Sequence, residues 1–502
     1  MESAEYSSAL GTFMLLAWPV LSVVLFARFR ASIAVPAALL AAYVLLPPRL
    51  AIDLPVIPAL DKESGAALAA TLVALFLVFQ SRRQSATSVD ALPGWIPRDP
   101  FAIFFLGCLI VGPILTVLTN RDRIPIGDFV LPGLRPYDAG SIILANLVML
   151  VPLLLGRKFL FNPGHHRDVL IVFAVIIGAY SILGLYEVRM SPQLNMMVYG
   201  YFPHDWIQHL RQEGFRPLVF LTHGLILGIL MCLCVLSAIG AARTSQGRTR
   251  LFFIAIAGFV FATLALSKSL GALMIAVVLL PVAILVGRRL QLLAAAAIAV
   301  LAIGYPYLRA VDVAPVGAVI ALAERIDPVR ASSFAFRIEN EDILLEKARE
   351  RPLAGWGGWG RNRVYDDRGR DISVTDGYWI GTFGMTGVVG YLGQFGLLTI
   401  PLIALAIRTR RNGVTLATSA LALVAAANLV DLLPNASIGP FTWLLAGAML
   451  GRLEAARSRD RRGESDAMLS SSAAPATAAP AGPAPRIPLR HTRFAPRHIR
   501  TR

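Results

Sequence analysis

Long apolar runs constrain this chain more than any other feature. Stretches of about 17 to 25 residues with almost no charge recur along its length, and a helix of about 20 apolar residues crosses the roughly 30 Å hydrocarbon core of a bilayer. Only 16% of the 502 residues are charged, whereas soluble proteins carry about 25%. The shortage is explained if most of the surface faces lipid. The sequence therefore predicts an all-α, polytopic integral membrane protein with about 12–13 transmembrane helices.

The limits of these runs define the predicted domains. The expected spans are residues 8–27, 32–48, 65–80, 101–119, 138–155, 168–186, 217–240, 251–267, 270–287, 290–308, 378–407, 414–433 and 438–453. They make a membrane domain over residues 1–455 that contains one large loop, residues 309–374. The run 378–407 is too long for one straight span, so part of it is expected to tilt or to lie at the interface.

Lysine and arginine in the short loops predict the orientation. Cytoplasmic loops carry an excess of these residues, and pairs such as Arg82 with Arg83 and Arg288 with Arg289 all fall on one side of the predicted membrane. This assignment places the C-terminus in the cytoplasm and the large loop on the outer face. It also places the N-terminus outside, and a miscount of one early span would move that end alone.

The tail, residues 456–502, has the composition of a disordered segment. It contains the low-complexity run "SSSAAPATAAPAGPAP" and ends in "RIPLRHTRFAPRHIRTR", and neither can bury a core. Its basic residues favour contact with the anionic inner leaflet, at about 1 kcal/mol per residue near the surface. Nucleic-acid binding is the less favoured alternative, and we expect no nucleic-acid partner.

Arginines stand in the short outer loops, against the usual charge bias. Arg189, Arg211 and Arg216 flank or occupy the loop over residues 188–216. A guanidinium offers two parallel charge-assisted hydrogen bonds to a phosphate. These arginines are therefore candidates for phosphate binding, and pairing with nearby acids or lipid headgroups is the alternative.

The large loop carries a glycine-rich segment between polar stretches. Residues 340–351 are expected to form a short helix that stops at Pro352. The following "GWGGWG" matches the spacing of a nucleotide-binding fingerprint, but it lacks the preceding strand and the following helix that this fingerprint requires. We interpret it as a tight turn in which Trp356 and Trp359 stack on sugars. Arg361 and Tyr378 are further candidates for substrate contact.

Three ionisable residues stand at the outer ends of predicted spans. Asp376 is expected to pair with an arginine or to act as a base, and capping of the next helix is the alternative. His223 is either a base or a hydrogen-bonded packing residue. Lys268 is either a substrate contact or a cation that reaches the headgroups.

No metal-binding pattern is evident. "DDRGRD" (residues 366–371) lacks the ligand spacing of a calcium loop and is expected to be a solvated turn. Cys232 and Cys234 are two residues apart on a predicted helix and point to different sides. We therefore expect no metal, no cofactor and no disulfide framework.

Four quoted segments form a recognisable combination: "RQEGFRPLVFLTHGL" (211–225), "LSKSLGALMIAVVLL" (266–280), "RIENEDILLEKARERPLAGWGGWG" (337–360) and "TDGYWIGTFGMTGVVGYL" (375–392). With them the chain resembles the superfamily of O-antigen ligases and O-antigen polymerases, over roughly residues 170–455. These are membrane glycosyltransferases that include exopolysaccharide polymerases, and residues 186–217 look most like that branch. The ligases usually have a histidine where this chain has Asp376.

The resemblance implies a GT-C-like fold in the bacterial inner membrane and a metal-independent transfer between polyprenyl-pyrophosphate-linked glycans on the periplasmic face. It implies that Arg211, Arg216 and Arg337 bind the pyrophosphate, with Lys268 beside them, and that Asp376 or His223 accepts a proton. The expected partners are the lipid-linked oligosaccharide, the bilayer and other polysaccharide assembly and export proteins. Ligation to a separate acceptor, transport of a lipid-linked glycan and a scaffold role remain alternatives.

Overall fold

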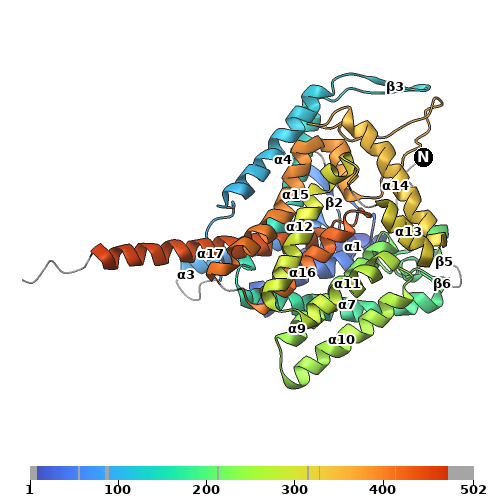
Figure 1. Cartoon of the computed structure of the whole chain (residues 1–502). Coiled ribbons are helices and arrows are strands. Elements are labelled where there is room, and N and C mark those ends of the chain that lie inside the picture. Colours follow the sequence, from blue (N-terminus) through green and yellow to red (C-terminus); the bar gives the residue numbers. More distant parts are fainter. Residues whose placement is uncertain are drawn as a thin grey trace, which may run out of the picture. The chain divides into compact units, whose positions relative to one another are not determined.

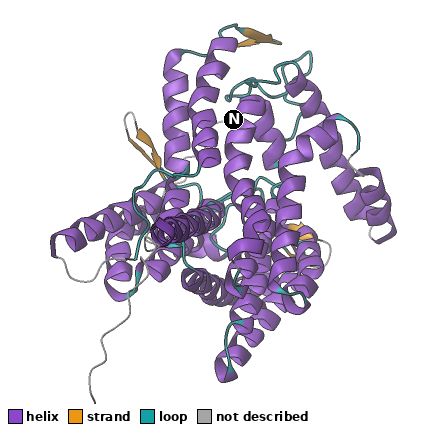
Figure 2. Ribbon diagram, turned by 60° about the vertical axis from the view of Figure 1, so that its left-hand side comes forward, coloured by secondary structure: helices purple, strands orange, loops and turns teal. Residues whose placement is uncertain are grey.

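The computed structural model describes residues 8–54, 57–84, 90–211, 214–313, 316–326, 328–412 and 414–472, and within these ranges it is predominantly helical (Figure 1). Figure 2 shows that strands occur in the described residues only as short hairpins. The helices are α1 (Ala9–Arg28), α2 (Ala31–Leu45), α3 (Ser64–Gln84), α4 (Pro100–Thr119), α5 (Pro136–Met149), α6 (Val151–Phe159), α7 (Pro163–Met190), α8 (Leu194–Tyr199), α9 (Gly224–Arg243), α10 (Gly247–Leu266), α11 (Leu270–Leu285), α12 (Arg288–Ala310), α13 (Val316–Ile326), α14 (Pro328–Arg349), α15 (Tyr378–Asn412), α16 (Leu416–Asp431) and α17 (Pro440–Ser472). The antiparallel hairpins pair β1 (Ile52–Leu54) with β2 (Ile57–Leu60), β3 (Ile124–Ile126) with β4 (Phe129–Leu131), and β5 (Leu210–Arg211) with β6 (Gly214–Phe215).

Many of these helices have the length and composition of membrane spans. In the described part of the chain, 8 are long and apolar enough to cross a bilayer: Ala9–Arg28, Pro100–Thr119, Pro136–Phe159, Pro163–Met190, Gly224–Arg243, Gly247–Leu266, Arg288–Ala310 and Tyr378–Arg408. Ala31–Leu45, Ser64–Phe79, Leu270–Leu285 and Leu416–Asp431 are shorter apolar helices. The chain is therefore a mostly helical, multi-pass membrane protein. The larger number of 12–13 spans stays a prediction.

Helix α9 lies at the centre of the bundle and packs against α7, α10, α11 and α16. Small residues permit these close approaches, as they do in membrane helix pairs generally. A Cβ atom added at Gly228 would lie 2.7 Å from Ser269 Cβ, and one added at Gly240 would lie 2.8 Å from Ala420 Cβ. A glycine on α9 thus leaves room for a small side chain of the neighbouring helix at each of these two positions.

Helix α15 is broken near its start, which resolves the excessive length of the predicted span. Gly387 has φ 61° and ψ −166°, a conformation that is essentially restricted to glycine. A Cβ atom there would lie 2.4 Å from the carbonyl carbon of Leu353. The break divides α15 into a short first part and a long second part.

The glycine loop, residues 352–357, fills this break and satisfies the backbone groups that it frees. Its Pro352 and Leu353 carbonyls accept the amides of Val388 and Val389, at 2.8 and 3.1 Å. In return the amides of Trp356 and Gly357 donate to the Gly384 and Met385 carbonyls, each at 2.9 Å. The remaining Ala354 and Gly355 carbonyls accept from Thr116 Oγ1 and Asn120 Nδ2. Buried backbone polar groups need such partners, so the glycines serve close backbone packing.

Two expectations about local structure are corrected. The helix expected at 340–351 begins earlier, because α14 starts at Pro328 and a separate helix, α13, precedes it. The span expected at 217–240 starts later, because residues 217–223 are not helical and α9 begins at Gly224. Both corrections change the setting of a candidate arginine. Arg337 lies in the middle of α14, and Arg216 lies in an irregular segment before α9.

The chain divides into two compact units, residues 1–456 and 457–502. Helix α17 continues to Ser472, so residues 456–472 are helical although we expected disorder there. This stretch contains four arginines, two alanines, Met468 and Leu469, which favour helix, and the first proline follows only at position 475. The remainder of the predicted tail, 473–502, lies outside the described residues.

Candidate functional site

Arg337 and Asp376 form an ion pair although 39 positions separate them. Arg337 Nε lies 3.4 Å from Asp376 Oδ2, and the two side chains are 29% and 31% exposed. Helix α14 supplies the arginine, and Asp376 stands just before α15. The expected pairing of Asp376 with an arginine is thus confirmed. The first amide of α15, that of Tyr378, donates to the carbonyls of Leu432 and Asn435.

A polar network extends from this pair to the end of α16. Arg337 Nη1 donates to Asn435 Oδ1 at 2.9 Å and to the Pro434 carbonyl at 3.3 Å. Asn435 Nδ2 in turn donates to the buried Asp431 Oδ1 at 2.9 Å. The guanidinium is therefore held by three groups from two segments, while its partial exposure leaves part of it accessible.

Helix α14 is fixed over α15 by buried contacts on one face. Trp379 Nε1 donates to Glu341 Oε1 at 2.8 Å, and the Val374 amide donates to Asn340 Oδ1 at 2.8 Å. Arg309, from the end of α12, lies 3.5 Å from Glu341 Oε2. Burial raises the pKa of Glu341 to about 7, although Trp379 and Arg309 oppose the shift. Arg337 lies one helical turn before Glu341 on α14.

A buried carboxylate shapes the segment that carries Arg216 and His223. Glu187 Oε2 accepts the amides of Leu218 and Val219, at 2.9 and 2.7 Å, and its Oε1 accepts the Leu194 amide at 2.9 Å. Val219 has φ 55°, which a β-branched residue rarely adopts. The carboxylate thus replaces the helical bonds expected for 217–223, a role that no local sequence pattern indicated.

The β5–β6 hairpin leads directly into this segment. The Arg216 amide donates to the His209 carbonyl at 2.9 Å, which closes the hairpin. Arg216 Nη2 donates to the Lys268 carbonyl at 3.4 Å, and Lys268 itself has φ 59° in the turn between α10 and α11. A Cβ atom on Gly214 would lie 3.5 Å from Lys268 Cε. Arg216 is therefore a neighbour of the turn that carries Lys268.

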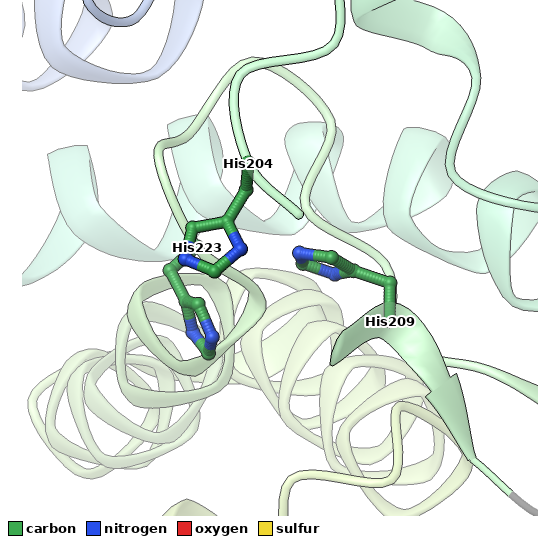
Figure 3. Close-up of side chains that lie close together, drawn as sticks. All are labelled: His204, His209 and His223. Atoms are coloured by element: carbon green, nitrogen blue, oxygen red, sulfur yellow. The ribbon is translucent and has the colours of Figure 1, made fainter. Parts of the chain in front are cut away.

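His223 caps α9 and belongs to a cluster of three histidines (Figure 3). Its Nδ1 accepts the Leu225 amide at 3.0 Å. The ring centroids of His204 and His209 lie 4.7 and 5.4 Å from that of His223, and 5.4 Å from each other. From the sequence, His223 alone was a candidate. His204 and His209 are five positions apart between α8 and β5, and this spacing by itself marks no site.

Positive charge surrounds His223. The pKa of His223 is lowered to about 2, first by burial. The neighbouring imidazoles of His204 and His209 lower it further, as do the guanidiniums of Arg216 and Arg337. His223 is therefore neutral at physiological pH. Its Nδ1 accepts the Leu225 amide, so the ring proton is on Nε2. Neither ring nitrogen then has a free lone pair to accept a proton from a substrate, which argues against His223 as the base.

The candidates in the large loop belong to a second set of contacts. Arg361 is buried and donates to the carbonyls of Asp122 and Pro132, at 3.1 and 2.9 Å, and to that of Trp356 at 3.3 Å. Trp356 is also buried, with Lys347 Nζ 3.8 Å and Arg351 Cζ 4.1 Å from its ring centroid. These contacts close the loop against the β3–β4 hairpin. They give Arg361 and Trp356 structural roles, whereas Trp359 is 59% exposed and free to contact a ligand.

The remaining candidates have varied positions. Arg189 is exposed at the end of α7. Tyr378 is the first residue of α15, and its hydroxyl donates a hydrogen bond to Gln394 Oε1. The backbone of Arg211 pairs with Gly214 in the hairpin, and its side chain lies outside the described residues. The predicted turn at 366–371 is closed by Asp366, which accepts the Arg368 and Arg370 amides and pairs with Arg370.

The arrangement combines anion binding with a carboxylate. Arg216 and Arg337 both lie close enough to His223 to lower its pKa, and Arg337 is in contact with Asp376. Guanidiniums of this kind bind phosphate oxygens, and a carboxylate beside one stays ionised. Comparison of the chain with protein-family models, with curated proteins and with solved structures finds no match.

Proposed function

We propose that this protein is a membrane glycosyltransferase that joins polyprenyl-pyrophosphate-linked glycan units, as an O-antigen or exopolysaccharide polymerase does. The observation that carries the proposal is the meeting of Arg337, in the middle of α14, with Asp376, just before the membrane helix α15. Arg216 and His223, which precede α9, lie near this pair. The resemblance of residues 337–392 to the polymerase and ligase superfamily supplies the reaction class. A lipid-linked substrate fits a site at this position, because its polyprenyl chain stays in the bilayer while its glycan reaches the surface.

Arg216 and Arg337 would bind the pyrophosphate of the donor. Negative charge develops on this group as the bond to the anomeric carbon breaks, and preorganised donors stabilise it. Arg337 suits this role because Asn435, Pro434 and Asp376 fix its guanidinium while 29% of the side chain stays exposed. Lys268 adds a further cation beside Arg216.

Asp376 would act as the general base. A hydroxyl of the acceptor glycan attacks the anomeric carbon of the donor and gives its proton to Asp376, while polyprenyl pyrophosphate leaves with the electrons of the broken C–O bond. General-base help of this kind contributes about 10²–10⁴ in rate. The alternative base, His223, is less suitable because its Nδ1 already accepts the Leu225 amide.

The proposed location is the bacterial inner membrane, with the site and the large loop on the periplasmic face. In this topology the basic tail is cytoplasmic. The charge pattern of the short loops supports the orientation, and the substrate class agrees with it, because lipid-linked glycans are joined outside the cytoplasm in the resembled superfamily. Other polysaccharide assembly and export proteins are proposed as partners.

The test is an extension assay with the purified full-length protein in lipid. A polyprenyl-pyrophosphate-linked oligosaccharide is added, and the products are sized. We expect a ladder of longer lipid-linked glycans, which Arg337→Ala reduces by about 10²–10³. Arg370→Ala is the matched control, because Arg370 lies in the same loop and is 72% exposed.

The outcomes separate the candidate functions. Transfer of a single unit to an added acceptor, without a ladder, would identify a ligase, for which the same cations and base would serve. A glycan that is neither extended nor transferred would exclude both reactions. Equal activity of Arg337→Ala and Arg370→Ala would exclude the proposed site.

A further inference from the structure

The three clustered histidines come from separate segments that the fold brings to one point. His204 stands in the loop after α8, His209 ends the short 3-10 helix Trp206–His209, and His223 caps α9. One nitrogen of each ring lies within 4.8 Å of one nitrogen of each other ring. Figure 3 shows the three rings grouped at the end of α9. Burial of a polar ring costs free energy unless the ring has a bonding partner, and His209 is fully buried.

His209 is held in the form that binds metals. Its Nδ1 lies 3.1 Å from the Arg216 carbonyl, and a carbonyl only accepts, so the ring proton is on Nδ1. The lone pair is therefore on Nε2. This is the arrangement of metal-bound histidines, whose other nitrogen donates to a backbone carbonyl or a carboxylate. The β5–β6 hairpin fixes the ring, because the Arg216 amide also donates to the His209 carbonyl.

His204 and His223 complete the set in different ways. His204 Nδ1 lies 3.5 Å from the Asp205 carbonyl, which favours the same tautomer as in His209. Half-buried His204 also gives the cluster access to solvent, as an entry path for an ion requires. His223 keeps its lone pair on Nδ1, where it accepts the Leu225 amide. A metal that uses this lone pair takes the place of that capping bond.

The donor set indicates the class of metal. Imidazole nitrogens suit zinc, copper, nickel and iron, and magnesium or calcium prefer oxygen ligands. Zinc–nitrogen bonds of 2.0–2.1 Å put neighbouring ligand atoms of a tetrahedron about 3.3 Å apart, so the rings would close inward from 4.8 Å. Three imidazoles bring no negative charge, and the fourth position would hold water or an anionic oxygen.

We propose that His204, His209 and His223 bind one divalent transition-metal ion of the zinc class. This departs from the expectation of a metal-independent protein, which rested on the absence of a metal-binding motif and on the family resemblance. The proposal does not depend on the proposed function, because it concerns binding and needs no glycan.

The experiment measures metal binding to the full-length protein, purified in detergent without a polyhistidine tag and stripped with a chelator. Zinc content is determined by elemental analysis after dialysis, and Co²⁺ binding is followed by its visible absorption. We expect about one ion per chain, and at least a tenfold loss of affinity in His209→Ala. His165→Ala is the control, because His165 pairs with Asp90 elsewhere in the fold.

A second variant keeps the test informative if His209→Ala does not fold. His204→Cys retains a ligand for the metal, and we expect it to bind Co²⁺ with a thiolate charge-transfer band that the wild type lacks. Thermal unfolding of each variant without metal shows whether the fold persists. Wild-type protein that binds no stoichiometric metal would overturn the proposal. So would a His204→Cys spectrum identical to that of the wild type.

Discussion

Arg337 on α14 lies 3.4 Å from Asp376, which precedes α15. The pair joins the large loop to the membrane helices at the point where the proposed chemistry takes place. Because both side chains are about 30% exposed, water screens their attraction, and an exposed pair of this kind contributes under about 1 kcal/mol to stability. A functional role and a structural role therefore predict different results for its variants.

Asp376→Asn is expected to lower glycan extension by about 10²–10⁴, because the amide cannot accept the proton of the attacking hydroxyl. The thermal unfolding midpoint in detergent should stay close to that of the wild type. Asp376→Glu restores a base one methylene further out, and we expect it to recover part of the rate. A variant in which rate and midpoint fall together would assign Asp376 to structure alone.

Gly387→Ala is expected to destabilise the protein by at least about 2 kcal/mol, because the backbone conformation at Gly387 excludes other residues. The added methyl would also lie 2.4 Å from the Leu353 backbone. Gly384→Ala is the matched control three residues earlier in α15, where the nearest atom would lie 3.7 Å away. Thermal unfolding in detergent compares the two. Similar midpoints would contradict the close packing of the glycine loop against α15.

Glu341 predicts a pH dependence of stability. Burial raises its pKa from 4.5 to about 7, so the folded state favours the protonated form. The stabilising contribution is complete below about pH 4.5 and is lost as the pH rises to about 7, by about 3 kcal/mol at most. Glu341→Gln keeps an acceptor for Trp379 and removes the titration.

We therefore expect Glu341→Gln to gain stability relative to the wild type between pH 5 and pH 8, as measured by thermal unfolding. Glu339→Gln, at an exposed position on the same helix, controls for the loss of one negative charge. Parallel midpoint curves for the wild type and Glu341→Gln would refute the predicted titration.

Variants at Arg361 and Trp359 distinguish a structural role from a binding role within the large loop. Arg361→Ala leaves the carbonyls of Asp122 and Pro132 without their donor, and we expect a loss of about 2–3 kcal/mol together with faster proteolysis of the loop. Trp359→Ala, at a site 59% exposed, should change stability by less than about 0.5 kcal/mol. If Trp359 stacks on the glycan, its loss raises KM for the lipid-linked substrate. A stable Arg361→Ala protein would show that the loop does not need this guanidinium.

Much of the architecture was predictable, because a span is a local property of composition. The spans predicted at 101–119 and 290–308 agree closely with the helices Pro100–Thr119 and Arg288–Ala310. The pairing of Asp376 with an arginine was also expected, since a carboxylate at the end of a span needs a partner. The identity of that partner was not deducible from spacing.

The errors arose where distant groups override local preference. Residues 217–223 are apolar enough to continue α9, but Glu187 holds two of their amides and prevents the helix. The segment 355–360 was interpreted as a tight turn, whereas the amides of Trp356 and Gly357 pair with the backbone of the broken helix α15. His204 and His209 gave no signal on their own, because their meaning depends on a third ring in another segment.

The sequence by itself determined that this protein is helical and crosses the membrane repeatedly, because hydropathy and span length act within one segment at a time. Only the tertiary structure decided which arginine meets Asp376, why α15 is broken at Gly387, and that three histidines share one place. These relations join segments far apart in the chain. They depend on hydrogen bonds and close packing between helices, and no local pattern of residues contains that information.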